Sequence, residues 1–195
     1  MIKYSVETNK TVNSFVKGSA FIRRNFLGEE VFKNVGVEHM NSQEYLQAVK
    51  SRFNHKVTVR LDKQDMFIAY EEVFKWAWMA TKLKITSFVK IVPSAQLSDF
   101  ESYSENCLKQ AIRDKKGLPV GFQNAVVSYS VMASEAISSE AIVFATSRPK
   151  KHFAAFETPV LFDLNNNELY YYKEKIIWGR AYDRFFKEYL LNHFK

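Results

Sequence analysis

The spacing of apolar and polar residues changes along the chain, and its period predicts where strands and helices lie. The clearest pattern covers residues 153–175, FAAFETPVLFDLNNNELYYYKEK, where two β-prone runs flank three consecutive asparagines at 165–167. Asparagine tolerates the left-handed backbone of tight turns, so this segment predicts a β-hairpin. Its strands are expected over residues 158–164 and 168–173.

The first forty residues give a weaker pattern. Apolar residues recur near one helical stripe over residues 9–27, although Gly18 weakens a helix there. A short helix followed by an extended piece is the alternative, and the periodicity does not choose between the two. Residues 28–40 contain two glycines and mixed charge, so we expect a loop.

A clearer helix is predicted over residues 42–53. Asn41 or Ser42 can cap it, and Glu44 lies in its first turn, which is the pattern of a capping box. The next segment, 56–61, alternates valine with polar residues, as a strand buried on one face does.

Residues 65–83, DMFIAYEEVFKWAWMATKL, contain no glycine or proline, and Asp65 could cap a helix there. Their apolar residues would occupy most of the circumference of that helix. Such a helix must be covered on several sides or paired with another chain. The segment therefore predicts a long helix and favours contact with a protein partner or a second copy of the chain.

The C-terminal half alternates between strand and helix patterns. We expect a strand over 85–92, a helix through residue 116 and an interior strand over 122–133. Ser138 then begins a short helix over 141–146, which is followed by the hairpin and a last helix over 176–194. Residues 98–194 then run helix, strand, helix, strand, strand, helix. This order predicts an α+β fold with a mixed, mostly antiparallel sheet and helices packed on it.

The order strand, helix, strand, strand, helix, with Pro159 following Thr158 at the entrance to the hairpin, resembles the second half of a thioredoxin-like fold. The resemblance implies an α/β alternative for the fold and a cis bond between Thr158 and Pro159. The chain has no CxxC motif, so no redox function is carried over.

Composition narrows the class of protein. The chain of 195 residues is 47% hydrophobic and no Pro, Gly or Ser-rich linker divides it, so a single globular domain over 1–195 is expected. Its start lacks the apolar core of a signal peptide, and Cys107 alone forms no internal disulfide; we expect a soluble, cytoplasmic protein with no membrane partner and a buried structural thiol.

Motifs for catalysis or cofactors are absent from the sequence. The four histidines are scattered, and the glycines form no phosphate-binding loop, so neither a metal nor a cofactor is expected. The catalytic candidates are Glu157 and Asp163, which share a strand face, and Lys173 on the partner strand. Solvated charges at a sheet edge are the simpler interpretation.

A net charge of +7 favours anionic partners, and cations alternate with aromatic rings near the hairpin. Cations contact phosphates and rings stack on bases at single-stranded nucleic-acid surfaces. The candidate nucleic-acid-binding residues are Arg148, Lys150, Lys151, Tyr171, Lys173 and Lys175.

Three hypotheses for function follow. The first is a non-catalytic binding or interaction domain that could self-associate, because the chain combines an apolar predicted helix with no catalytic motif. The second is a nucleic-acid-binding protein that uses the basic, aromatic hairpin. The third is an enzyme with a carboxylate and lysine site.

Overall fold

The computed structural model divides the chain into two compact units, Met1–Val37 and Glu38–Lys195, which are described separately. The expectation of one domain over the whole chain stays a prediction. The structure describes residues 20–24, 30–34, 40–54, 56–61, 64–74, 82–115, 124–175 and 182–195.

The described part of the first unit is a β-hairpin. Strand β1 (Ala20–Arg24) pairs antiparallel with β2 (Glu30–Asn34), and Ile22 lies opposite Phe32. Of the two alternatives for 9–27, a helix through the whole segment is wrong at residues 20–24, where the strand fits the extended piece of the other. The loop expected over 28–40 is wrong at residues 30–34. The two segments form hydrogen bonds between their backbones. The spacing of apolar residues within one segment does not reveal such a partner. The rest of 9–27 lies outside the described residues.

The second unit is built on one sheet whose six strands follow each other in sequence order. They are β3 (Lys56–Leu61), β4 (Gln64–Phe74), β5 (Lys82–Ala95), β6 (Asn124–Ile137), β7 (Ala155–Asp163) and β8 (Glu168–Tyr170). The β5–β6 and β6–β7 pairs are parallel, and the other three pairs are antiparallel. The predicted mixed, mostly antiparallel sheet is confirmed.

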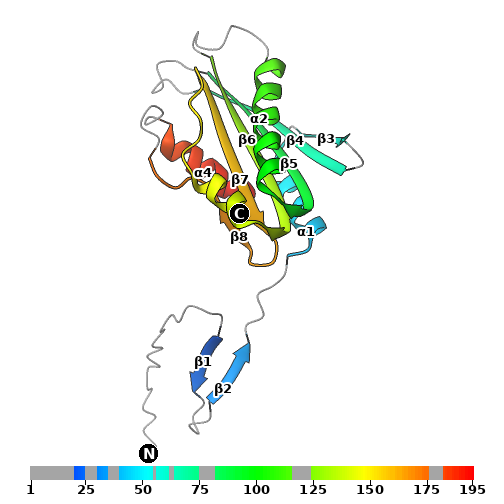
Figure 1. Ribbon diagram of the computed structural model, residues 1–195, viewed down its shortest axis with the longest axis vertical. Helices are drawn as coiled ribbons and strands as arrows, with labels where there is room; N and C mark the ends of the chain where they lie inside the picture. Colours follow the sequence, from blue (N-terminus) through cyan, green and yellow to red (C-terminus); the bar gives the residue numbers. More distant parts are fainter. Residues whose placement is uncertain are drawn as a thin grey trace, which may run out of the picture. The chain divides into compact units, whose positions relative to one another are not determined.

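Helices cover both faces of this sheet, which gives three layers (Figure 1). Helices α1 (Ser42–Ser51) and α4 (Asp183–Phe194) pack on one face, and α2 (Leu97–Asp114) and α3 (Ser139–Thr146) pack on the other. Alternate residues of each strand face opposite layers. In β7, Phe156 and Phe162 pack with α1 and α4, whereas Ala155 and Leu161 pack with α2 and α3. The predicted C-terminal order of elements is confirmed.

Local signals placed the ends of two helices correctly. The Asn41 side chain accepts a hydrogen bond from the Gln43 backbone at 3.0 Å, and Glu44 accepts one from the Asn41 backbone at 3.3 Å. This is the predicted capping box of α1. At α3, the Ser138 hydroxyl accepts a hydrogen bond from the Ala141 backbone at 3.2 Å.

The long helix predicted over residues 65–83 is wrong. Strands β4 and β5 form an antiparallel pair there, with Phe74 opposite Lys82. In β4, Phe67 packs against the α1 and α4 layer, and Ile68 packs against the α2 layer. A strand covered on both faces contains consecutive apolar residues, so its period cannot be told from that of a buried helix. Within this segment Phe67, Ile68 and Leu83 are buried inside the chain, whereas Tyr70 and Phe74 are exposed. Trp76 and Trp78 lie outside the described residues.

The cis bond implied at Thr158–Pro159 is also wrong, since no cis peptide bond occurs among the described residues. Pro159 lies inside β7, next to Ser130 of β6. Strand β8 pairs only with residues 161–163, so β7 is an edge strand at this point and tolerates a residue without an N–H. The thioredoxin-like alternative loses its main support.

Candidate functional site

A chain of buried polar side chains joins β7 to α2. The carboxylate of Glu157, only 7% exposed, accepts a hydrogen bond from the Ser104 hydroxyl at 2.7 Å. Ser104 in turn accepts one from the Ser130 hydroxyl at 2.8 Å. The second carboxylate oxygen lies 3.0 Å from Nε2 of His152. Both oxygens of this buried carboxylate therefore have partners, as burial of a charge requires.

His152 belongs to a tight turn that precedes β7. It forms an isolated β-bridge with Ala155, and Phe153 and Ala154 make the tip of the turn. Ala154 has a φ of 48°, a left-handed conformation that is uncommon for a residue other than glycine. The Ala154 carbonyl accepts a hydrogen bond from the Val126 backbone at 3.1 Å, which helps hold the turn together with the His152–Glu157 contact. These two contacts keep the turn in a conformation that costs free energy. Such a conformation points to a function for the residues at the tip of the turn.

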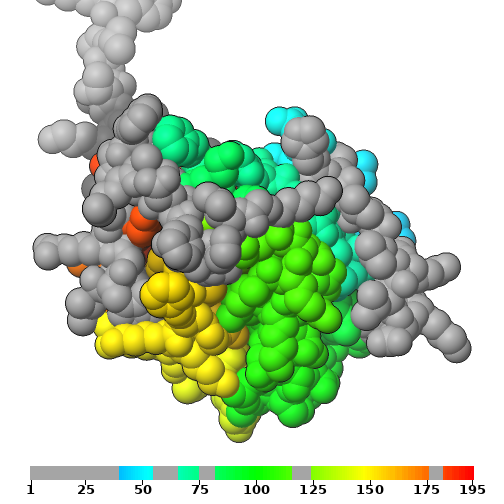
Figure 2. Space-filling view, turned by 90° about the horizontal axis from the view of Figure 1, so that it is seen from above, coloured from blue at the N-terminus to red at the C-terminus, as the bar shows by residue number. Residues whose placement is uncertain are grey.

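We call residues 148–154 the basic turn. Its Phe153 side chain is 84% exposed, the largest exposure of any described bulky apolar residue. Arg148 and Lys151 are exposed as well, while Lys150 forms an ion pair with Glu101 of α2 at 3.2 Å. That contact raises the pKa of Lys150. Figure 2 shows this part of the chain (yellow) beside α2 (green).

We call residues 171–175, which follow β8, the tyrosine segment. Its Tyr171 is half-buried and packs against the α1 and α4 layer, and the Lys173 ammonium lies 5.8 Å from the centre of the Tyr171 ring. Lys187 of α4 donates hydrogen bonds to the Glu174 carbonyl at 3.0 Å and to Asp183 at 2.9 Å. The segment is thus fixed on α4.

The basic turn and the tyrosine segment border the same shallow hollow. Pro149 lines it from the first segment, Tyr171 and Tyr172 line it from the second, and Lys187 lines it from α4. Of the predicted nucleic-acid-binding residues, Tyr171 lines this hollow, whereas Arg148, Lys150 and Lys151 do not, although their neighbour Pro149 does.

The three catalytic candidates do not meet. Asp163 accepts hydrogen bonds from the Asn165 and Asn166 backbones at 2.9 and 3.1 Å and from the Asn166 side chain at 2.7 Å, so it anchors the hairpin turn. Glu157 lies six residues earlier on the same unbroken strand, which places the two roughly 20 Å apart at about 3.3 Å per residue. Lys173 rests on the Tyr171 ring.

The predicted asparagine turn is present, with Asn167 in the left-handed conformation at a φ of 51°. The contribution of Ser104, Ser130 and His152 was missed by sequence reasoning. Ser104 contacts Glu157 from α2, His152 contacts it across a turn of five positions, and Ser130 of β6 contacts Ser104; no periodic signal links such residues.

Cys107 is buried on α2, as expected. Burial raises the pKa of its thiol to about 12, so the thiol stays protonated and weakly nucleophilic at neutral pH. In the part of the chain that the structure describes, no three His, Cys, Asp or Glu side chains are grouped to hold a metal ion. Within the same residues, no helix combines the length and apolar character needed to cross a bilayer.

Comparisons of this chain with protein family models, with curated proteins and with solved structures gave no match.

Proposed function

We propose that the chain is a non-catalytic binding domain whose partner is a single-stranded nucleic acid, held by the basic turn and the tyrosine segment. The observation that carries the proposal is Phe153, a large ring that is 84% exposed. It lies on a turn that the contact between His152 and Glu157 holds in place. An aromatic face beside cations is the common element of surfaces that stack bases and contact phosphates.

The charge distribution supports the same partner. Four cations of this surface, Arg148, Lys151, Lys173 and Lys175, have exposed side chains. If each contacts one phosphate, the logarithm of the binding constant should fall with the logarithm of salt concentration with a slope of about −3, at about 0.7 per contact for single strands. Lys150 should contribute less, because Glu101 partly neutralises it.

The two other hypotheses receive less support. Glu157, Asp163 and Lys173 do not converge, so an enzyme is not proposed. Self-association was motivated by residues 65–83, which supply two strands of the sheet in place of an apolar helix. A homo-oligomer stays a prediction, and light scattering of the full chain measures it directly.

The test is titration of a fluorescently labelled single-stranded oligonucleotide, either DNA or RNA, with the full chain at about 50 mM salt, where phosphate contacts are strongest. Phe153→Ala should weaken binding by at least about fivefold, since loss of one stacked base costs about 1–3 kcal/mol. The matched control is Val143→Ala, which removes an exposed apolar side chain, 63% exposed, from α3. It should leave the affinity unchanged.

The charge contribution has its own control. Lys151→Gln should reduce the salt slope by about 0.7, whereas Lys82→Gln, on β5 two strands away from β7, should not change it. Absence of binding to both oligonucleotides at low salt, or equal affinities of the Phe153→Ala variant and the parent chain, would overturn the proposal. Binding to anionic lipid vesicles without binding to either oligonucleotide would overturn it too.

A further inference from the structure

A cleft separate from the basic turn lies between α2 and the end of β4. The pairing of β4 with β5 stops at Met66 and Lys90, but β5 continues to Ala95. Helix α2 lies over β5 and β6, so the uncovered part of β5 and the side of α2 enclose a cleft of about 600 Å³. This volume is within the range of about 300–1,000 Å³ that is typical of small-molecule sites.

The floor of the cleft is apolar and its helix side is polar. Met66, Val92 and Met132 come from three neighbouring strands, and all are buried. Methionine side chains adapt their shape to a bound apolar group. Along α2, Asn106 and Gln110 are four residues apart and so lie on one face of the helix, from which they line the cleft.

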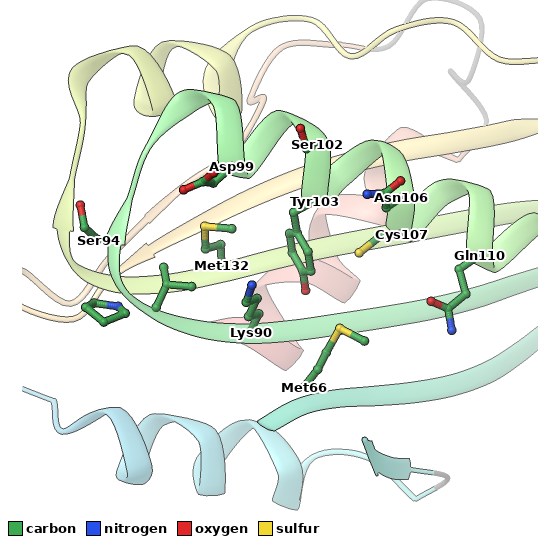
Figure 3. A pocket seen from close by; sticks show the side chains of 12 residues that line it. Met66, Lys90, Ser94, Asp99, Ser102, Tyr103, Asn106, Cys107, Gln110 and Met132 are labelled. Carbon is green, nitrogen blue, oxygen red and sulfur yellow. The ribbon is translucent and has the colours of Figure 1, made fainter. Parts of the chain in front are cut away.

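Lys90 is the only cationic side chain among the described residues that line this cleft. It is half-buried and extends from β5 toward α2, where the ring of Tyr103 lies opposite (Figure 3). Among the described residues, no carboxylate forms an ion pair with Lys90 within 4.0 Å. A half-buried ammonium that forms no ion pair with the described residues attracts an anionic group.

Asp99 limits the total charge that the cleft accepts. It lines the cleft from the first turn of α2, on the same side as Ser94 in Figure 3. A second negative charge on the ligand would be repelled there. We propose that this cleft binds a small amphipathic monoanion, whose acidic head group contacts Lys90 and whose apolar body rests on Met66, Val92 and Met132.

A carboxylate and a sulfate monoester are both monoanions and share this chemistry, so the test uses matched probes with one alkyl chain. Octanoate, octyl sulfate and octanol are titrated into the full chain, and binding is followed by calorimetry and by amide chemical shifts. At least one anion should bind more tightly than octanol, and the tighter of the two identifies the head group.

Lys90→Gln should weaken the binding of that anion by at least about tenfold, because the acidic head group loses its hydrogen bond to a charged donor. Lys109→Gln is the matched control, since it removes an exposed lysine that lies on α2 outside the cleft. Asn106→Trp, at an exposed helix position, should block the cleft without changing the core, so it tests the site even if Lys90→Gln fails to fold.

Failure of both anions to bind at about 1 mM, the limit of weak affinity, would overturn the proposal. So would equal binding of octanol and the anions, or an unchanged affinity in both the Lys90→Gln and Asn106→Trp variants. The outcome is independent of nucleic-acid binding, because the basic turn contributes no residue to this cleft.

Discussion

The two faces of the sheet differ in how they are packed. Against α1 and α4, one continuous apolar cluster includes residues from β4, β5, β6, β7 and β8. Against α2 and α3, the apolar residues form two smaller clusters. The polar chain of Ser104, Ser130 and Glu157 lies on this second face. Ser128, next to Glu157 in the sheet, has a buried hydroxyl without a hydrogen-bond partner among the described residues.

Aromatic stacking fastens the α1 and α4 face. The Tyr45 and Phe162 rings are 4.1 Å apart, and those of Tyr129 and Tyr189 are 5.0 Å apart. The Tyr45 hydroxyl donates to the Phe194 carbonyl at 3.2 Å and the Tyr129 hydroxyl to that of Phe186 at 3.0 Å. Burial raises the pKa of both hydroxyls. Each ring thus buries a large apolar area and satisfies its polar end on α4.

The comparison suggests a division of labour between the faces. The continuous aromatic face stabilises the fold. On the divided face, some buried positions hold polar side chains that fix the basic turn, and a cleft lies beside α2. Polar groups inside a protein cost stability unless they are paired, and on this face the buried carboxylate of Glu157 is paired with the side chains that hold the basic turn. Four substitutions test this contrast.

The largest effect is expected on the aromatic face. Phe162→Ala should lower the free energy of unfolding by about 3–5 kcal/mol, because it removes a fully buried ring and leaves a cavity. Urea denaturation measures the change, with the exposed Val143→Ala as a control expected to stay within about 0.5 kcal/mol. A loss below about 1 kcal/mol would mean that this face does not carry the stability we assign to it.

The second effect is expected in the polar chain. Glu157→Ala should destabilise the chain by about 1.5–3 kcal/mol, since Ser104 and His152 lose their charged acceptor inside the protein. Ser104→Ala, which leaves the contact with His152, should cost about 1 kcal/mol. If the Glu157 variant is as stable as the parent chain in urea, the buried carboxylate does not hold the turn.

A smaller effect is expected where a single hydroxyl is removed from the aromatic face. The Tyr189 hydroxyl donates to Glu71 and lies 3.4 Å from the Ser87 hydroxyl, so Tyr189→Phe should cost about 1 kcal/mol at neutral pH. The Tyr170 hydroxyl donates a hydrogen bond to Glu168 near the surface, so Tyr170→Phe should lower the free energy of unfolding by less.

The Tyr189 prediction has a pH dependence with a defined sign. Burial, followed by the contact with Glu71, raises the pKa of Tyr189 above its ordinary value of 10.0. The folded chain therefore keeps this proton more tightly than the unfolded chain, and the resulting stability is present below pH 10.0 and is lost as pH rises above it. The gap between parent and Tyr189→Phe should narrow in that range. A gap that widens would contradict the assigned direction.

The smallest effect is expected at the turn. Ala154→Gly should raise the free energy of unfolding by up to about 1 kcal/mol, because glycine adopts the left-handed conformation without the cost that alanine bears. Ala48→Gly in α1 should do the opposite and destabilise the chain by about 1 kcal/mol. Thermal unfolding of both variants decides, and a lower melting temperature for Ala154→Gly would show that the turn is not strained.

The sequence alone determined the features that depend on neighbouring residues. The capping box of Asn41 and Glu44, the Ser138 cap and the asparagine turn each involve groups within a few positions of one another. Strand β6 was also recognisable, because Val126, Val127, Tyr129 and Val131 give it several β-branched and aromatic residues within a short stretch. The C-terminal order of elements followed from these local signals.

Only the tertiary structure decided which segments pair and which side chains meet. Residues 64–74 are a strand because β3 and β5 supply hydrogen bonds on both sides and helical layers cover both faces. The amino-acid sequence of the segment alone reveals neither of these neighbours. The candidate sites have the same origin. Ser104 meets Glu157 across 53 positions, and the basic turn borders the tyrosine segment, because parallel crossovers place distant elements side by side.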